Sequence, residues 1–426
     1  MTFHLEENHT TIYKEIIAGL TSFITVAYII IVNPTIMEYS IGMDFGSVMM
    51  ATILATAVST LFMGLVANFP FVVAPAMGLN TYFAFGIVID GGHTWQEALG
   101  ACFIAGSIVT LLNFFDFRQT LMNAIPKNLK IAITGGIGLF LASIGLQKVE
   151  LIVADPATLV ALGDVKMPAA YLTLFGICLI VILMQRSFKM AILIGILVNW
   201  IIGLFTGLSA WQGLISMPPS IAPTFLKLDI MSVLHIEYTL IILSLVFVST
   251  FGSTSVLVSL AERGLYVNND GKIPKLRRAL YADSLGTMLS ASLGTSTLTP
   301  YSESMVGLEA GGRTGLTAVV VAILFLLSLF LEPFFSSIPN FAVAPVLIVI
   351  GALMLKPLQN LDWSDLTELV PAFLILISIP LTFNIASGIA LGFVSYPVIK
   401  LFSGKGKEVS PLVWAVALVF TLKFLF

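Results

Sequence analysis

Charged residues are scarce in this chain, and their scarcity is the first guide to its class. Asp, Glu, Lys and Arg make up 10% of the 426 residues, whereas a soluble domain contains about 25%. The mean hydropathy is +1.02, and apolar runs of helix-spanning length recur from end to end. Continuous runs such as residues 314–335 are unlike the short alternating strands of a membrane β-barrel. The composition therefore predicts an all-α polytopic membrane protein.

Cysteine and histidine are also rare, which argues against a metal site or an enzyme. The two cysteines, Cys102 and Cys178, fall in separate apolar segments, where they are expected to be small buried hydrophobes and not a disulfide or a metal pair. No zinc or phosphate-binding motif occurs, and the net charge of −3 is spread over short loops. We therefore expect no enzyme activity, cofactor, metal or nucleic-acid partner. The four histidines lie in the termini or in predicted loops: His4, His9, His93 and His235.

The apolar runs form two sets of seven, separated by a polar break. The break, residues 208–236, contains three prolines and has the composition of an external loop. Residues 1–207 and 237–426 are therefore the two predicted halves. A last apolar stretch, residues 413–426, is too short to assign as a span. The expected segments are 15–37, 46–66, 70–88, 96–115, 129–147, 168–185 and 188–207, then 237–262, 278–293, 295–309, 314–335, 338–356, 366–383 and 385–402.

The distribution of lysine and arginine predicts the orientation of these segments. If the N-terminus is cytoplasmic, 16 of the 20 basic residues fall in loops on the cytoplasmic side, as the positive-inside rule requires. Because seven is odd, the two halves then cross the membrane in opposite directions, which is the inverted repeat of many secondary transporters. The four exceptions are Lys148, Lys166, Lys227 and Lys423.

The third segment of each half is a poor helix. Residues 71–80 (FVVAPAMGLN) and 294–303 (GTSTLTPYSE) each begin with residues typical of strands and then meet a proline, Pro75 or Pro300. Because a proline and the residue before it resist helix, each segment is expected to run extended and then turn helical. Such breaks are tolerated at membrane depth only where they face protein or a wet cavity. The alternative is two proline-kinked helices without a site.

Glu303 is the sharpest polar feature of the chain. It follows the break in the second of these segments, and a charge at the bilayer centre costs about 2.5–3.5 kcal/mol. It should therefore face a cavity or a partner, or be protonated and hydrogen-bonded between helices. Tyr301, Ser302 and Ser304 place hydroxyls around it. A planar ligand with N–H donors for the carboxylate suits this arrangement, whereas an inorganic anion would be repelled.

Several longer stretches resemble one known family. The chain is similar over almost its whole length to the AzgA-like adenine, guanine and hypoxanthine permeases of nucleobase:cation symporter family 2. The resemblance rests on residues 15–37 (EIIAGLTSFITVAYIIIVNPTIM), 74–85 (APAMGLNTYFAF), 135–147 (GGIGLFLASIGLQ), 155–164 (DPATLVALGD), 270–287 (DGKIPKLRRALYADSLGT), 293–304 (LGTSTLTPYSES), 309–320 (EAGGRTGLTAVV) and 385–396 (IASGIALGFVSY).

The resemblance implies a fold, a location and a function. It implies 14 segments as a 7+7 inverted repeat, with short strands in segments 3 and 10. Segments 1–4 and 8–11 would form a core domain, and segments 5–7 and 12–14 a gate domain through which relatives often dimerise. The implied function is import of a purine nucleobase across the inner membrane by proton symport, with the core rocking against the gate.

The resemblance matches Glu303 to an acid that serves the base and the proton in these permeases, and from this match we hypothesise the contacts with the base. Glu303 would accept its ring N–H groups and carry the proton, and backbone N–H groups near Gly78 and Ser302 would bind its acceptors. Tyr28, Met77 and Phe251 would form apolar walls. The full set expected to bind substrate is Tyr28, Met77, Gly78, Asn80, Phe251, Gly252, Ser253, Tyr301, Ser302, Glu303 and Ser304.

The chain departs from the family pattern in segment 8. The family has an aspartate there, in a Phe-Asp-Thr motif, whereas the aligned residue is Gly252, and an earlier acid is replaced by Ser249. Only one of two expected carboxylates is therefore present. Three alternatives stay open: a facilitator without proton coupling, a carrier of another heterocycle or an organic anion, and a receptor that binds without transport. The sequence does not choose between adenine and the 6-oxopurines.

Overall fold

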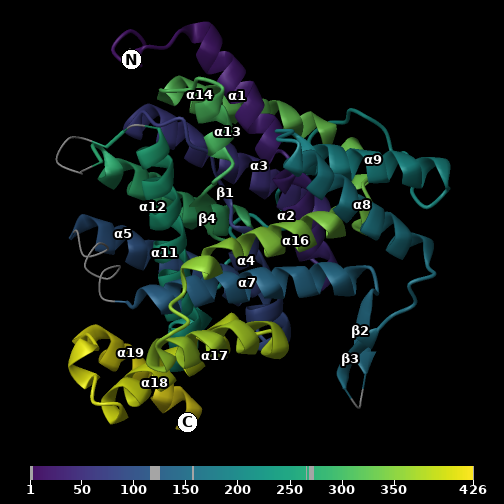
Figure 1. Ribbon diagram of the computed structural model, residues 1–426. Coiled ribbons are helices and arrows are strands. Elements are labelled where there is room, and N and C mark those ends of the chain that lie inside the picture. Colours follow the sequence, from purple (N-terminus) through teal and green to yellow (C-terminus); the bar gives the residue numbers. More distant parts are fainter. Residues whose placement is uncertain (1–2, 116–124, 156–157, 265, 268–272, 426) are drawn as a thin grey trace.

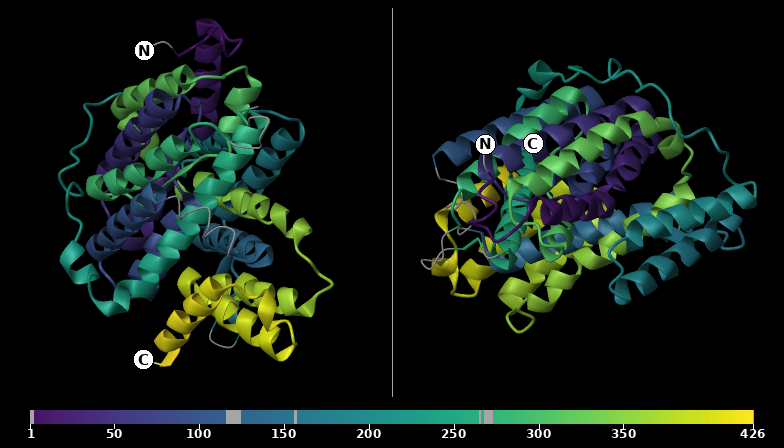
Figure 2. Two further views of the ribbon diagram at one scale, coloured as in Figure 1. Left: turned by 90° about the vertical axis from the view of Figure 1, so that its left-hand side faces the viewer. Right: turned by 90° about the horizontal axis from the view of Figure 1, so that it is seen from above.

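Figures 1 and 2 show the computed structural model, which describes residues 3–115, 125–155, 158–264, 266–267 and 273–425. Parts of two of the stretches that carry the resemblance, residues 156–157 and 270–272, lie outside the described residues. The helices of the first half are α1 (Ile12–Val26), α2 (Ile29–Ile41), α3 (Phe45–Phe62), η1 (Met63–Ala67), α4 (Met77–Thr81), η2 (Tyr82–Asp90), α5 (Trp95–Phe114), α7 (Lys127–Lys148), α8 (Pro168–Gln185) and α9 (Ala191–Phe205).

The second half repeats this pattern of long and short helices. Its elements are α10 (Ile230–Val233), η3 (Ile236–Tyr238), α11 (Thr239–Arg263), α12 (Leu276–Leu293), α13 (Ser304–Glu309), α14 (Gly315–Ser328), η4 (Leu329–Leu331), α15 (Glu332–Ser336), α16 (Asn340–Met354), η5 (Lys356–Asn360), α17 (Leu366–Thr382), α18 (Ile385–Phe402), η6 (Gly406–Glu408) and α19 (Pro411–Leu425). Within the described residues, nine helices are long and apolar enough to cross a membrane, while α9, α17 and most of α19 are shorter apolar helices.

Short polar side chains start many of these helices. Thr11 accepts the backbone N–H of Lys14 at the start of α1, and Asp44 accepts that of Ser47 at the start of α3. Thr94 forms a reciprocal capping box with Glu97 at the start of α5. Such caps satisfy N–H groups that have no partner inside the helix.

The two broken segments meet as a pair of antiparallel strands. Strand β1 (Val73–Pro75) pairs with β4 (Leu298–Pro300), with Val73 opposite Pro300 and Pro75 opposite Leu298. Helix α4 follows β1 and helix α13 follows β4, so each segment changes from extended to helical next to its proline, as predicted. The Oγ1 of Thr60 accepts the backbone N–H of Val73 at 3.0 Å. The polar backbone of the break is therefore satisfied inside the protein.

The long helices pack in two groups. One group contains α1, α2, α3, α5, α11, α12 and α14 around the strand pair, and the other contains α7, α8, α9 and α16–α19. Helices α7 and α16 run side by side across Figure 1. A Cβ at Gly351 of α16 would overlap the carbonyl oxygen of Gly138 of α7, so this close packing requires glycine. The division of the chain into a core and a gate domain stays a prediction.

Three features differ from the sequence-based expectations or extend them. The loop after α7 contains a hairpin of strands β2 (Ile152–Asp155) and β3 (Leu159–Leu162), which was not predicted. Cys102 is buried as expected, but Cys178 is exposed, because α8 buries few of its residues. The stretch after residue 410, left unassigned, forms helix α19 packed on α18.

Candidate functional site

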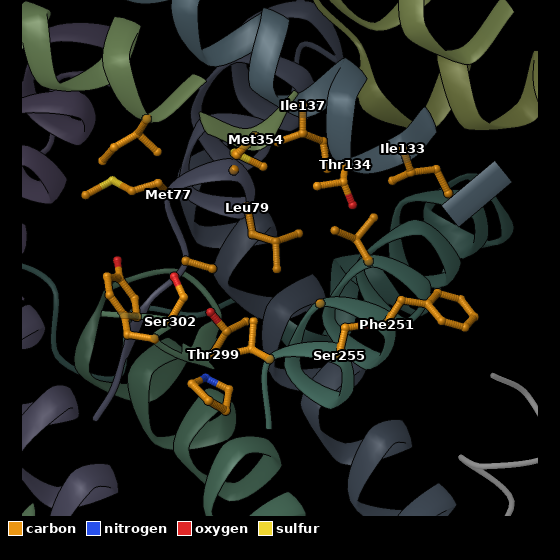
Figure 3. Close-up of a pocket in the computed structure, with 18 of the residues that line it drawn as sticks. Met77, Leu79, Ile133, Thr134, Ile137, Phe251, Ser255, Thr299, Ser302 and Met354 are labelled. Carbon is orange, nitrogen blue, oxygen red and sulfur yellow. The ribbon is translucent and has the colours of Figure 1, made fainter. Parts of the chain in front are cut away.

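A cavity of about 560 Å³ lies where the two broken segments meet the helices of the other group. Its lower wall in Figure 3 includes Thr299 and Ser302 of the second broken segment, with Phe251 and Ser255 of α11. Ile133, Thr134 and Ile137 of α7 lie across from them, beside Met354 of α16. The cavity therefore separates the two helix groups.

Glu303 lines this cavity and precedes the first turn of α13. Its Oε1 accepts a hydrogen bond of 3.0 Å from the phenolic hydroxyl of Tyr28, and its Oε2 accepts one of 3.0 Å from the Ser302 hydroxyl. Tyr28 lies at the two-residue interruption between α1 and α2. Among the described residues that line the cavity, Glu303 is the sole acid. Each of its oxygens retains lone pairs that can accept further N–H groups.

Tyr301 joins the two broken segments. Its hydroxyl donates to the carbonyl oxygen of Pro75 at 2.5 Å, and its backbone N–H donates to the carbonyl oxygen of Val72 at 2.9 Å. The ring also lines the cavity. Because both ends of the residue are bonded to the β1 segment, the residue before Ser302 and Glu303 is held in one position. Tyr301 thus fixes the start of the stretch that carries the carboxylate.

The α11 wall has open space at Gly252, where the resemblance leads us to expect an aspartate. A Cβ at Gly252 would meet no described atom within 4 Å, and Gly252, Phe251 and Ser255 all line the cavity. The ammonium of Lys130 lies 5.9 Å from the centre of the Phe251 ring. Lys130 lines the cavity as well, so the described lining holds one acid and one cation.

Eight of the eleven residues expected to bind substrate line this cavity, and three do not. Asn80 is buried and accepts a hydrogen bond from the Ser296 hydroxyl. The Ser253 hydroxyl donates to Asp283 at 2.8 Å. The Ser304 hydroxyl accepts the backbone N–H of Val72 at 2.9 Å. These three side chains hold elements of the scaffold together. The eight that line the cavity are Tyr28, Met77, Gly78, Phe251, Gly252, Tyr301, Ser302 and Glu303.

Sequence reasoning missed the wall formed by α7 and α16. Lys130 and Thr134 of α7 and Met354 of α16 line the cavity, but they lie near the ends of apolar runs, where polar residues are common. The spacing of Lys130, Thr134 and Ile137 places them on one face of a helix, which was the signal available. Within the described part of the chain, no group of three His, Cys, Asp or Glu residues could hold a metal ion.

Comparisons with known proteins agree with this architecture. Residues 13–391 match a family described as a permease family. The chain is 42% identical over 432 residues to the guanine/hypoxanthine permease of Bacillus subtilis, covering 99% of both chains. It is 41% identical over 424 residues to an adenine permease of Escherichia coli, covering 100% of this chain and 95% of that one.

A solved structure shares the fold. The transmembrane domain of a cyanobacterial bicarbonate transporter superposes with a TM-score of 0.65 at 14% identity, covering 92% of this chain and 98% of the other. At this identity the likeness concerns the fold alone, which is the 7+7 type predicted from the sequence. The family match and the identities to purine permeases together place the chain: it is a multi-pass membrane protein that belongs to the permease family, within its AzgA-like branch.

Proposed function

We propose that this protein imports a purine nucleobase across the inner membrane by proton symport, with its N-terminus in the cytoplasm. The observation that carries the proposal is the Glu303 carboxylate, which lines a cavity between the two helix groups and is held there by Tyr28. Relatives named as adenine and guanine/hypoxanthine permeases support a purine as the substrate.

The chemistry of the cavity suits a flat heterocycle. A volume of about 560 Å³ falls in the usual range of about 300–1,000 Å³ for small-molecule sites. Glu303 would accept N–H groups at one edge of the base, while Phe251, Met77 and Ile137 cover its faces. Aromatic and aliphatic walls with a few polar groups orient a ligand of this type.

Glu303 also has the chemistry of a proton carrier. A carboxyl group changes between acceptor and donor when it is protonated, so the same side chain can hold the base and carry the proton. Protonation would remove the charge before the site crosses the membrane, which lowers the cost of moving it. The core and gate domains would move against each other around this site, as in other inverted-repeat transporters.

A facilitated carrier without proton coupling is the second candidate, and Gly252 favours it. The absent carboxylate leaves open space in the α11 wall, and a hydroxyl such as that of Ser255 cannot carry a proton at ordinary pH. The same space could admit another heterocycle or an organic anion.

Uptake into proteoliposomes distinguishes these candidates. Radiolabelled adenine, guanine and hypoxanthine would be supplied with and without an inward proton gradient. Gradient-driven accumulation of one base supports symport, and equilibration without accumulation supports the facilitated carrier. If none of the three is taken up, the purine proposal is wrong, and direct uptake of radiolabelled pyrimidines and small carboxylates tests the other substrates.

A further inference from the structure

Lys148 is the last residue of α7 and one of the four basic residues that lie outside the predicted cytoplasmic loops. It is 7% exposed. Its ammonium donates to the carbonyl oxygen of Thr35 at 3.0 Å and lies 4.8 Å from the centre of the Tyr39 ring. Thr35 and Tyr39 belong to α2, in the helix group on the other side of the cavity. The contact therefore joins the two groups.

A second polar contact joins the groups at a different pair of elements. The side-chain amide of Asn384, which precedes α18, donates to Oδ2 of Asp90 at 2.6 Å. Asp90 ends η2, in the segment that also carries β1 and α4. With a cytoplasmic N-terminus, segments 1, 3 and 5 all end on the outer side, and segment 14 begins there. Both contacts, Lys148–Thr35 and Asn384–Asp90, are thus predicted to lie on the outer side of the membrane.

The cavity lies toward the other end of α7. Its lining includes Lys130 and Thr134 in the first turns of that helix, and Lys148 follows Lys130 by about 27 Å at about 1.5 Å per residue. Ile137 lies between them, where a Cβ on Gly78 would overlap its Cγ2 atom. Along α7 from the cavity toward the outer side, the first contact with the opposite helix group is therefore the apolar one between Ile137 and Gly78. The second is the hydrogen bond of the Lys148 ammonium.

We infer that Lys148–Thr35 and Asn384–Asp90 form an outer latch, which closes the cavity to the outside and must open for the substrate to enter. The inference rests on the proposed transport function, because it assigns the contacts to one of two alternating states. A lysine suits a reversible latch. In the closed state its ammonium contacts a carbonyl oxygen and an aromatic face in place of water. When the two helix groups separate, water can hydrate the ammonium again. An apolar side chain at this position would lose the specific partner.

The test measures access to the cavity from outside the cell. The native cysteines are replaced (Cys102→Ala, Cys178→Ser), and Thr134→Cys provides a reporter in the cavity wall. Intact expressing cells are treated with a membrane-impermeant maleimide, and the labelling rate is compared between variants. Lys148→Met should raise the labelling rate about tenfold, because the loss of one hydrogen bond to a charged group shifts the equilibrium between closed and open states by about that factor. Lys148→Arg should stay close to the parent.

Lys166→Met is the matched control, because Lys166 is an exposed lysine on the same predicted side. It should leave labelling unchanged. Asp90→Ala tests the second contact at an exposed site and should raise labelling even if Lys148→Met fails to fold. Because an unfolded chain would also be labelled, a single symmetric size-exclusion peak of each detergent-solubilised variant verifies that it is folded. If neither Lys148→Met nor Asp90→Ala increases labelling from outside, or if Lys166→Met increases it equally, the latch is overturned.

Uptake measured on the parent chain, which keeps Thr134 and the latch residues, separates this inference from the transport proposal. Increased labelling in the latch variants, with no purine uptake by the parent chain, would keep the latch and overturn the purine proposal. Purine uptake with unchanged labelling would keep the transport proposal and overturn the latch.

Discussion

The phenolic hydroxyl of Tyr28 donates a 3.0 Å hydrogen bond to Oε1 of Glu303, although the two residues belong to opposite halves of the chain. Tyr28 interrupts the first span, and Glu303 follows the strand of the tenth segment. The bond orients the carboxylate toward the cavity and leaves its other oxygen near Ser302. Any ligand that binds Glu303 therefore meets a carboxylate whose direction is already set, which reduces the entropy lost on binding.

Removal of the Glu303 charge should abolish proton-driven accumulation. Glu303→Gln keeps the shape of the side chain but cannot exchange a proton, so the gradient should no longer drive uptake. Loss of the charged acceptor should also weaken base binding about tenfold or more. Uptake and binding in proteoliposomes measure both effects. Glu309→Gln, at the exposed end of α13, is the matched control and should behave as the parent. Unchanged accumulation in Glu303→Gln would remove Glu303 from the mechanism.

Tyr28→Phe tests the orientation of the carboxylate. The change removes one hydroxyl and leaves the ring that lines the cavity. Because a hydrogen bond to a charged group contributes about 1.5–3 kcal/mol, the affinity for the base should fall about tenfold with the fold intact. Tyr13→Phe removes an equivalent hydroxyl from an exposed position on α1 and should have no effect. An affinity unaltered by Tyr28→Phe would show that the bond does not organise the site.

Gly252 and Gly78 should respond differently to the same added methyl group. A Cβ at Gly252 meets no described atom within 4 Å, whereas one at Gly78 overlaps the Cγ2 atom of Ile137. That atom lies on a β-branched side chain with few alternative rotamers, so Gly78→Ala should destabilise the protein by about 1–3 kcal/mol. Gly252→Ala should stay within about 0.5 kcal/mol of the parent. Thermal unfolding in detergent compares the two. If the two substitutions lowered the stability equally, the space at Gly252 would not be open.

Lys400 should be essential to the stability of the α17–α18 pair. Its side chain is 2% exposed, and its ammonium lies 2.9 Å from Glu368 and 2.8 Å from Glu408. The Glu368 side chain is only 18% exposed, and a poorly solvated carboxylate left without its cation costs about 1–3 kcal/mol, so Lys400→Met should lower the unfolding temperature.

Lys405→Met is the control for this change. Lys405 pairs with Asp365 at 2.7 Å, but its side chain is 42% exposed, and exposed pairs contribute about 0–1 kcal/mol. The hydrogen bond from Lys405 holds the pKa of Asp365 well below its usual range, so the pair is charged at neutral pH in the parent. If Lys405→Met lowered the unfolding temperature as much as Lys400→Met does, burial of the lysine would not decide the size of the effect.

Features that depend on local sequence could be predicted. Apolar length located the fourteen segments, and Pro75 and Pro300 marked the two that begin as strands, because proline restricts its own residue and the one before it. Glu303 stood out because an acid at membrane depth is costly. The resemblance to the AzgA-like permeases added the expected site residues and showed that Gly252 departs from the pattern.

The direction of each side chain was decided only by the tertiary structure. Gly252 and Ser253 are neighbours in sequence, yet one lines the cavity and the other donates to Asp283, since a helix turns by about 100° per residue. Asn80 and Ser304 likewise bond to the scaffold. The wall from α7 and α16, the Tyr28–Glu303 bond and the Lys148–Thr35 contact all join segments far apart in the chain. Their existence depends on how the two helix groups pack, and no local pattern of residues encodes that packing.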